Sequence, residues 1–209
     1  MASDTGTGRL DRMRRFPHLT FPVADLDALR DLHAGDRVWV DGTIYGLRDA
    51  THIAMFDRGE RPRRADLCGA AIVHTAPNVR RAADGGFEKL CIGTTTSARM
   101  DRFTRGLLSE YGVRAIMGKA GLLPGSLPAL EEFGGVYLAL VGGSAALTTT
   151  QIEAIEDVEF EELLPECLWT FRVKDWGPLF VAMDAHGRSL FDEIQGEARG
   201  VLDELDARL

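Results

Sequence analysis

One junction in the sequence does most to narrow the folds open to this chain. At residues 90–101 an apolar run breaks at a glycine, passes through four hydroxyl residues and enters an amphipathic stretch. The apolar part suits the end of a buried strand, and Thr96 or Ser97 can cap the first turn of a helix behind it. A strand that passes through a short polar turn into a helix is typical of α/β proteins, whose ligands bind at such strand ends.

Two interpretations of this junction stay open at this point. A helix start directs unpaired backbone N–H groups and the positive end of the helix dipole at one place, which suits a carboxylate or a phosphate. Arg99 would add a planar, two-pronged donor near that place. A capped helix without any ligand fits the same residues.

Similar junctions recur along the chain and set the expected architecture. We expect strands at residues 37–45, 70–73, 88–92, 114–117, 136–141, 168–173 and 179–184, and a final helix over 190–209 with one apolar stripe. Asp41 and Gly42 indicate a bulge or a turn. Residues 174–178 are expected to connect the last two strands, and the acidic residues 152–162 are expected at the surface. Helical crossovers are mixed with hairpin-like stretches, so a purely parallel sheet is not assured. We therefore predict one α/β domain over residues 17–209, preceded by a flexible tail at 1–16.

Composition limits the partners that the chain can have. The formal net charge of -8 and the pI of about 5.2 argue against nucleic acid or an anionic membrane surface, although a few arginines can still converge on a small anion. No apolar run approaches the roughly 20 residues of a membrane-spanning helix. Residues 1–15 lack the apolar segment of a signal peptide, so a frayed tail is the expected structure there.

The three cysteines, Cys68, Cys91 and Cys167, lie far apart without ligand spacing. An odd and sparse set of thiols fits a reducing cytoplasm, which is the expected location. Three thiolates could in principle hold an iron–sulfur cluster, but apolar surroundings favour small core residues, so we expect no metal site on this chain.

Three polar turns carry the residues that point to chemistry. They hold Arg48, Asp49 and His52 in the first turn, Thr95 and Arg99 in the second, and Lys119 between two glycines in the third. If the turns meet at one edge of the sheet, their three cations suit a dicarboxylate, since each carboxylate can take a bidentate arginine. The sequence shows no Ser-His-Asp pattern, metal-ligand cluster or dinucleotide fingerprint, so the harder chemistry would have to come from elsewhere.

Other polar or small-residue features keep simpler interpretations. The arginines at 58, 61, 63 and 64 form either a solvated loop or a rim that steers an anionic substrate or meets another subunit. His186 is read as a turn residue, and the small residues 142–146 serve either subunit packing or internal packing.

Taken in order, several motifs resemble one known family. They are GT at 42–43, RDATH at 48–52, GTTTSARMD at 93–101, GK at 118–119, LPECLW at 164–169 and GPLFVAMDAHG at 177–187. This order resembles the beta subunit of iron–sulfur-dependent class I fumarases and L-tartrate dehydratases, over residues 35–190. The resemblance implies a swivelling β/β/α domain with a mixed sheet.

The resemblance also implies a division of labour between two chains. A separate alpha subunit would hold a [4Fe-4S] cluster through its own cysteines, with one iron open as a Lewis acid, while this chain binds no cluster. The expected assembly is α2β2, and the expected reaction is the reversible hydration of fumarate to malate. The alternatives are a tartrate dehydratase beta subunit acting on a 2-hydroxy diacid, and a dicarboxylate-binding module without enzymatic activity.

Residue roles carried over from the resemblance fall on the three turns. Arg48, Arg99 and Lys119 would bind substrate carboxylates, and Thr95 would take the proton from the carbon next to a carboxylate. A neutral threonine is a weak base, so the neighbouring cations would have to stabilise its alkoxide. Asp49 would orient Arg48, and His52 would support the site from behind.

Departures from the family pattern lie beside these positions. Thr94 stands where a proline is usual, Ala120 where a glycine is usual, and residues 74–77 read HTAP instead of the usual HAGP. The expected catalytic positions persist while their supports change, which leaves the identity of the substrate open more than the class of reaction.

Overall fold

A computed structural model describes residues 16–83, 85–143 and 145–206, so the predicted tail at 1–16 lies outside these residues except for Phe16. The strands of its larger sheet are β1 (His18–Phe21), β2 (Arg37–Leu47), β3 (Ala71–His74), β6 (Ala115–Gly118), β7 (Val136–Ala139), β8 (Ile152–Glu159) and β9 (Leu168–Met183). A small hairpin of β4 (Asn78–Arg81) and β5 (Phe87–Cys91) makes a second sheet. The mixed α/β architecture predicted from the sequence is confirmed.

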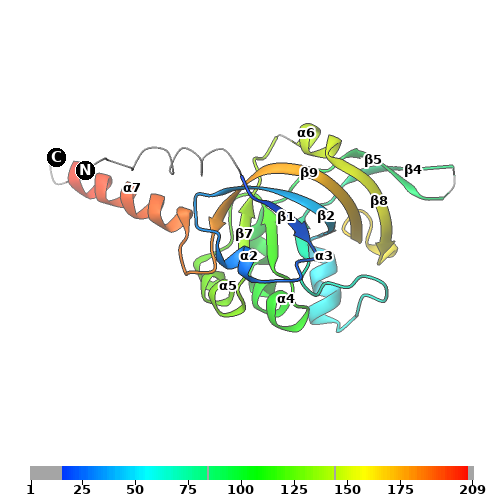
Figure 1. Cartoon of the computed structure of the whole chain (residues 1–209), viewed down its shortest axis with the longest axis horizontal. Helices are drawn as coiled ribbons and strands as arrows, with labels where there is room; N and C mark the ends of the chain where they lie inside the picture. Colours follow the sequence, from blue (N-terminus) through cyan, green and yellow to red (C-terminus); the bar gives the residue numbers. More distant parts are fainter. Residues whose placement is uncertain (1–15, 84, 144, 207–209) are drawn as a thin grey trace, which may run out of the picture.

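The larger sheet closes into a ring. Its strand order is β1-β2-β3-β6-β7-β9-β8, and β2 also pairs with β9, so the five strands β2, β3, β6, β7 and β9 form a closed circuit. The β1–β2, β2–β3, β3–β6 and β6–β7 pairs are parallel, whereas β9 runs antiparallel to β2, β7 and β8. Figure 1 shows β2 and β9 curving together over the shorter strands.

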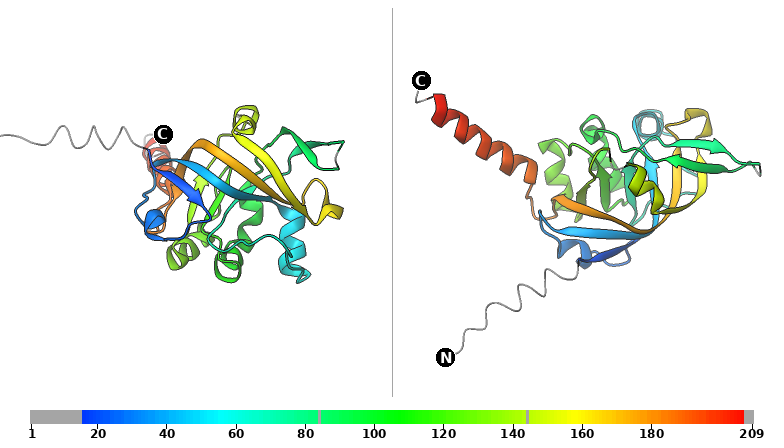
Figure 2. Two further views of the ribbon diagram at one scale, coloured as in Figure 1. Left: turned by 45° about the vertical axis from the view of Figure 1, so that its right-hand side comes forward. Right: turned by 90° about the horizontal axis from the view of Figure 1, so that it is seen from above.

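The helices lie between successive strands and after the last strand, β9. They are α2 (Asp27–Arg30), α3 (Asp49–His52), the π-helical turn η1 (Ile53–Asp57), the 3₁₀ helix η2 (Ser97–Phe103), α4 (Thr104–Glu110), η3 (Pro124–Ser126), α5 (Leu127–Phe133), α6 (Ala145–Thr150), η4 (Glu161–Leu163) and α7 (Leu190–Asp206). Figures 1 and 2 show α3, α4 and α5 gathered on one side of the strands, with α7 projecting away from them. None of the helices among the described residues is long and apolar enough to cross a membrane.

Both faces of the central strands are buried. Val73, Met117 and Leu138 belong to one apolar cluster, while their neighbours Ile72 and Ile116 belong to a second cluster beneath the helices. Successive side chains of a strand point to opposite faces, so the two clusters are the two sides of the same strands. Burial on both sides explains why these strands read as continuous apolar runs rather than as alternating ones.

The bulge expected at Asp41 and Gly42 is confirmed. The pairing of β2 with β9 shifts register between Val40 and Gly42. Gly42 has a φ of 95°, and a Cβ atom there would lie 2.2 Å from the carbonyl oxygen of Phe21. Only glycine permits both the backbone angle and this close approach of β1.

The C-terminal strands differ from the prediction in two ways. The two strands expected at 168–173 and 179–184 are one strand, β9, because Asp175 and Gly177 adopt positive φ angles within it and the Asp175 N–H donates to Asp41 Oδ1 at 2.7 Å. The acidic segment 152–162 lies mostly at the surface, as expected, but it also contains the edge strand β8, which was not predicted and whose Ile152 and Val158 are buried against β9.

Two predicted helices also differ from the structure. Neither Thr96 nor Ser97 caps an α-helix through its side chain, since the chain enters the 3₁₀ helix η2 first and becomes α-helical only at Thr104. The last helix, α7, forms as expected. None of its described residues is fully buried, and of its apolar stripe only Phe191 packs partly on the domain.

Candidate functional site

The predicted site residues meet where the chain leaves the parallel strands. Arg48 directly follows β2, Lys119 directly follows β6, and Thr95 lies in the loop between β5 and η2. Backbone bonds fix that loop, because the Thr95 N–H donates to the His74 carbonyl at 2.8 Å and the Ser97 N–H to the Lys119 carbonyl at 3.0 Å. The loop is thus held between the ends of β3 and β6, as the sequence predicts for a ligand site.

Arg99 joins the hydroxyl of the site to an acidic residue. Its Nη2 donates to Thr95 Oγ1 at 3.1 Å and to Asp49 Oδ2 at 2.8 Å, and its Nε donates to Asp49 Oδ1 at 3.1 Å. The hydrogen bonds from Arg99 are the main reason that the pKa of Asp49 is far below its usual range, and they raise the pKa of Arg99. Both groups are therefore charged throughout the physiological range.

Arg48 is held by two carboxylates. Its Nε lies 3.0 Å from Asp49 Oδ2 and 3.2 Å from Glu166 Oε1. Glu166 also accepts the Ala50 N–H at 2.8 Å, and its carbonyl oxygen accepts the Thr51 hydroxyl. The loop before β9 is thereby tied to the first turn of α3.

We call Arg48, Asp49, Thr95, Arg99 and Glu166 the arginine network. Asp49 binds the guanidinium groups of both Arg48 and Arg99. The prediction was only that Asp49 orients Arg48. Glu166 was not among the predicted site residues, although it lies within the LPECLW motif at 164–169. Among the described residues the Nη1 and Nη2 groups of Arg48, and Nη1 of Arg99, have no partner, so these donors remain for a ligand.

His52 lies behind the network and is completely buried. Its Nδ1 donates to the Arg48 carbonyl oxygen at 2.9 Å, and its ring stacks on Phe103 with centroids 5.0 Å apart. Burial lowers the pKa of His52 to about 4, so the ring is neutral. The structure therefore places His52 as a rigid support for the backbone of Arg48.

A second buried histidine links the network to the strand core. His74 Nδ1 lies 2.9 Å from Ser97 Oγ, to which Tyr137 donates its hydroxyl proton at 2.9 Å. Burial holds the pKa of His74 well below its usual value and raises the pKa of Tyr137 to about 12. These neutral groups fix Ser97, two residues from Thr95. From the sequence, Ser97 is expected only as a possible helix cap, and no role is predicted for Tyr137.

The thiols do not fit an iron–sulfur cluster. Cys68 is exposed, Cys91 is partly buried in β5 and Cys167 is buried at the start of β9, where burial raises the pKa of the thiol to about 12. Among the described residues, the only side chains placed to share a metal ion are His18, Asp41 and Asp175. The arginine network contains no thiolate: its two carboxylates are already paired with arginines, and its other groups are guanidinium groups and a hydroxyl.

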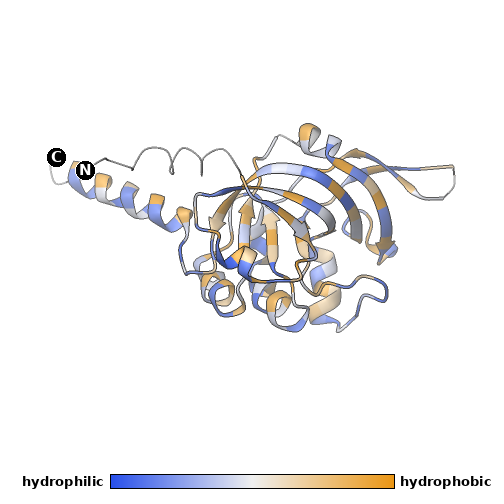
Figure 3. Ribbon diagram, in the orientation of Figure 1, coloured by the Kyte–Doolittle hydropathy of each residue, from blue (hydrophilic) through white to orange (hydrophobic). Residues whose placement is uncertain are grey.

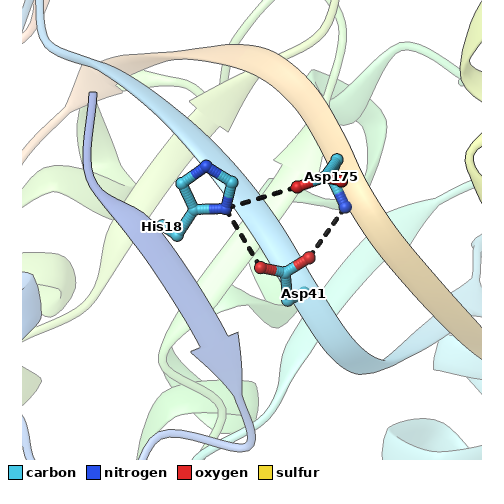
Figure 4. Close-up of side chains that lie close together, drawn as sticks. All are labelled: His18, Asp41 and Asp175. Atoms are coloured by element: carbon cyan, nitrogen blue, oxygen red, sulfur yellow. Dashed lines mark hydrogen bonds and ion pairs between the residues drawn. The ribbon is translucent and has the colours of Figure 1, made fainter. Parts of the chain in front are cut away.

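Figure 4 shows how His18, Asp41 and Asp175 converge from β1, β2 and β9. His18 Nδ1 lies 3.0 Å from Asp41 Oδ2 and 3.6 Å from Asp175 Oδ1, while Lys174 Nζ lies 3.1 Å from Asp41 Oδ1. Partial burial opposes ionisation of Asp41, but bonds from Asp175 N–H, His18 and Lys174 outweigh it and lower the pKa of Asp41. We call His18, Asp41, Lys174 and Asp175 the strand clip, because they join three strands. Lys174 offsets one of the two carboxylate charges of this group.

The other candidate features have structural contacts. Arg64 binds Asp157 of β8 with Nε at 2.6 Å, and Arg61 lies 3.5 Å from Glu110, so these arginines are paired within the chain. The ring of His186 stacks on His33, and the backbone N–H of His186 donates to Asp184 Oδ1 at 3.0 Å. Both contacts fit the predicted role as a turn residue.

Comparison with known proteins agrees with this geometry. The family described as "Fumarase C-terminus" matches residues 19–194. The chain is 39% identical over 176 residues to the L(+)-tartrate dehydratase subunit beta of Escherichia coli K12, covering 84% of this chain and 86% of that protein. It is 35% identical over 190 residues to a putative L(+)-tartrate dehydratase subunit beta of Methanocaldococcus jannaschii, covering 89% and 97%.

A longer relative matches in part. The chain is 39% identical over 186 residues to a putative fumarate hydratase class I of Geobacillus stearothermophilus, covering 88% of this chain and 35% of that protein. The resemblance predicted from the ordered motifs is thus confirmed. With the match spanning the ring of strands and every residue of the arginine network, the chain belongs to the fumarase C-terminus family.

Proposed function

We propose that this chain is the beta subunit of an iron–sulfur-dependent hydro-lyase that removes water from, or adds it to, a four-carbon dicarboxylate. The observation that carries the proposal is the arginine network, in which one hydroxyl, Thr95 Oγ1, lies 3.1 Å from Arg99 Nη2 beside a second guanidinium group. A proton acceptor next to fixed cations is what abstraction of a proton beside a carboxylate needs.

L(+)-tartrate is the better supported substrate, ahead of malate and fumarate. The two relatives named as tartrate dehydratase beta subunits match over 86% and 97% of their lengths, whereas the class I fumarate hydratase matches over 35% of its length. Our first expectation of a fumarate hydratase is therefore weaker than the tartrate alternative, and both reactions remove water from a 2-hydroxy dicarboxylate.

The two arginines divide the work in this proposal. Arg48 is held by Asp49 and Glu166 through Nε, which leaves its Nη1 and Nη2 edge for bidentate binding of one substrate carboxylate. Arg99 donates to Thr95 Oγ1 and stabilises the alkoxide form of Thr95, which accepts the substrate proton and becomes the neutral hydroxyl. Lys119, anchored next to the Thr95 loop by backbone bonds, supplies the charge for the second carboxylate.

The rest of the site would come from an alpha subunit. The described cysteines do not form a ligand set, so we assign the [4Fe-4S] cluster to the alpha chain. In this proposal the thiols of this chain take no part in the reaction. We further propose that the domain swivels over the partner and that the assembly is α2β2. The half-exposed side chain of Arg99 supports a site that a second chain completes.

The test is turnover of the purified chain mixed with its cognate alpha subunit under anaerobic conditions. We expect dehydration of L(+)-tartrate with a higher kcat/KM than that of malate, and no turnover by this chain alone. Robust turnover by this chain without the alpha subunit and iron would overturn the proposal. Tight dicarboxylate binding without turnover in the reconstituted complex would favour a binding module.

A further inference from the structure

The helix α7 stands apart from the rest of the domain. None of its residues from Leu190 to Asp206 is buried. Figures 1 and 2 show it extending away from the ring of strands, and Figure 3 shows apolar residues along its length. The family match ends at Ile194, so most of the helix lies beyond the part of the chain that matches the family.

The apolar residues of α7 form a seam. Phe191, Ile194, Ala198, Val201 and Leu205 follow one another at spacings of three or four residues, the pattern of a helix that packs on another element. Exposed fractions of 63% for Ile194, 57% for Val201 and 50% for Leu205 show that nothing among the described residues covers the seam beyond Phe191, whose ring packs partly on the domain. From Ile194 onward the seam is therefore an unpartnered face.

A helix of this length needs such a partner. Isolated helices shorter than about 12–15 residues are marginal in water even when rich in alanine. α7 is only slightly longer, and Gly196 and Gly200 each lower its stability by about 1 kcal/mol relative to alanine. Packing of the seam against another surface would provide the missing stabilisation.

The charge of α7 selects the kind of partner. Between Leu190 and Asp206 there are six carboxylates and one basic residue, Arg199. Of the charged residues of α7, only Glu193 has an ion-pair partner among the described residues, namely Arg188. On the helix Glu197 and Glu204 flank the seam, so two copies packed seam to seam would bring like charges together. A groove with lysine or arginine along its rim is complementary.

The N-terminal end of α7 lies close to the proposed active site. The Phe191 ring lies 6.4 Å from the ring of Tyr137, whose hydroxyl binds Ser97 next to the Thr95 loop. Phe191 also fills the space beside Gly121, where a Cβ atom would lie 2.5 Å from the ring. Gly121 follows Lys119 by two residues, so the helix begins beside the turn that carries a substrate-binding cation.

We propose that α7 is a docking arm for the alpha subunit. Its seam lies in an apolar groove of that subunit, and basic side chains on the rim of the groove face Glu197 and Glu204. The identity of the partner rests on the proposed function, which requires a second chain at this site. Docking holds the partner beside the Lys119 turn through Phe191.

The first experiment removes the seam. Val201→Ser combined with Leu205→Ser is compared with the wild-type chain in sedimentation-velocity titrations against the cognate alpha subunit under anaerobic conditions. We expect the apparent Kd to rise at least about tenfold, because two aliphatic side chains lose their buried surface. Thermal unfolding of the beta chain alone should stay unchanged, because both side chains are already exposed.

The second experiment tests the charge with a matched pair of variants. Glu204→Lys reverses a charge beside the seam, while Asp203→Lys makes the same change on the opposite face of the helix. We expect Glu204→Lys to weaken alpha binding about three- to tenfold at low salt, with a smaller effect at high salt, and Asp203→Lys to have little effect.

Several outcomes would overturn the proposal. Equal affinity of the seam variant and the wild type would do so, as would equal effects of the two lysine variants. Dimerisation of the isolated chain that depends on Val201 and Leu205 would show that a second copy is the occupant. These affinities are measured without turnover, so a wild-type complex that forms but has no hydro-lyase activity contradicts the proposed function and leaves the docking result intact.

Discussion

The arginine network and the strand clip are both clusters of cations and carboxylates on the same ring of strands. They differ in which of their hydrogen-bond donors already have partners. In the clip, Asp41 collects bonds from Lys174, His18 and the Asp175 N–H. In the network, Asp49 binds both guanidinium groups, and Nη1 and Nη2 of Arg48 and Nη1 of Arg99 have no hydrogen-bond partner among the described residues. The cluster that we propose as functional therefore differs from the clip by these donors and by a hydroxyl, not by its charge.

The sharpest test of this difference is the hydroxyl itself. Thr95→Ala removes the proposed base, and we expect kcat of the reconstituted enzyme to fall by about a thousandfold or more. Thr95→Ser keeps an oxygen at the same place and should retain much more activity. The loop should stay folded in both variants, because its contact with His74 is made by the backbone. Similar kcat values for Ala and Ser would exclude Thr95 as the base.

A next test compares two arginines of the same helix. Arg99 and Arg102 both lie in η2, and both bind an aspartate through two nitrogens, but only Arg99 reaches a hydroxyl. Arg99→Lys loses the planar fork, and we expect kcat/KM to fall at least about a hundredfold. Arg102→Lys should leave it nearly unchanged, and equal losses in the two variants would contradict the role of Arg99.

The buried histidines predict how stability depends on pH. Burial lowers the pKa of His52 to about 4 in the folded state, whereas the unfolded value is near 6.5. The unfolded chain therefore binds more protons between these values, and stability is lost as the pH falls through this window. For His52 alone the loss between pH 7 and pH 5 is about 2 kcal/mol.

Urea unfolding at several pH values measures this effect. His52→Phe keeps a ring beside Phe103 and removes the titrating group, so the curve of unfolding free energy against pH should become flatter from pH 7 to pH 5. His186→Gln, in an exposed turn, is the control and should keep the wild-type slope. An unchanged slope in His52→Phe would mean that the ring is not buried and neutral.

The smallest effect is expected in the clip. Asp41→Asn removes its ion pairs, but the side chains of His18 and Lys174 are 49% and 58% exposed, so the loss of stability should stay below about 1 kcal/mol. Turnover of the reconstituted enzyme should not change. A large loss of activity would show that the clip and the arginine network are coupled.

Much of the ring could be predicted from the sequence, because apolar runs and polar turns report local structure. The strands β3, β6 and β7 and the bulge at Gly42 follow the predicted pattern. The continuity of β9 could not be predicted, since Asp175, Gly177 and Pro178 are turn residues locally and only the distant Asp41 shows that the strand continues. The edge strand β8 was hidden by its exposed acidic residues, some of which pair with arginines from other parts of the chain.

The candidate site shows the same division. Arg48, Thr95, Arg99 and Lys119 stand at strand ends, where a motif read in order locates them. Glu166 reaches Arg48 across 118 positions of sequence, and Asp49 bridges two loops, so both contacts depend on the folded ring. Residue type at one position does not report such long-range partners.

The pairing of β2 with β9 has a consequence for how the protein is made. It joins residues such as Arg37 and Phe180, which are synthesised near the beginning and near the end of the chain. Until β9 leaves the ribosome, one edge of β2 has no partner strand and the circuit cannot close. Pairing over such a sequence separation is slow, so the last step of folding should be ring closure, and the unfinished chain is the species most exposed to aggregation.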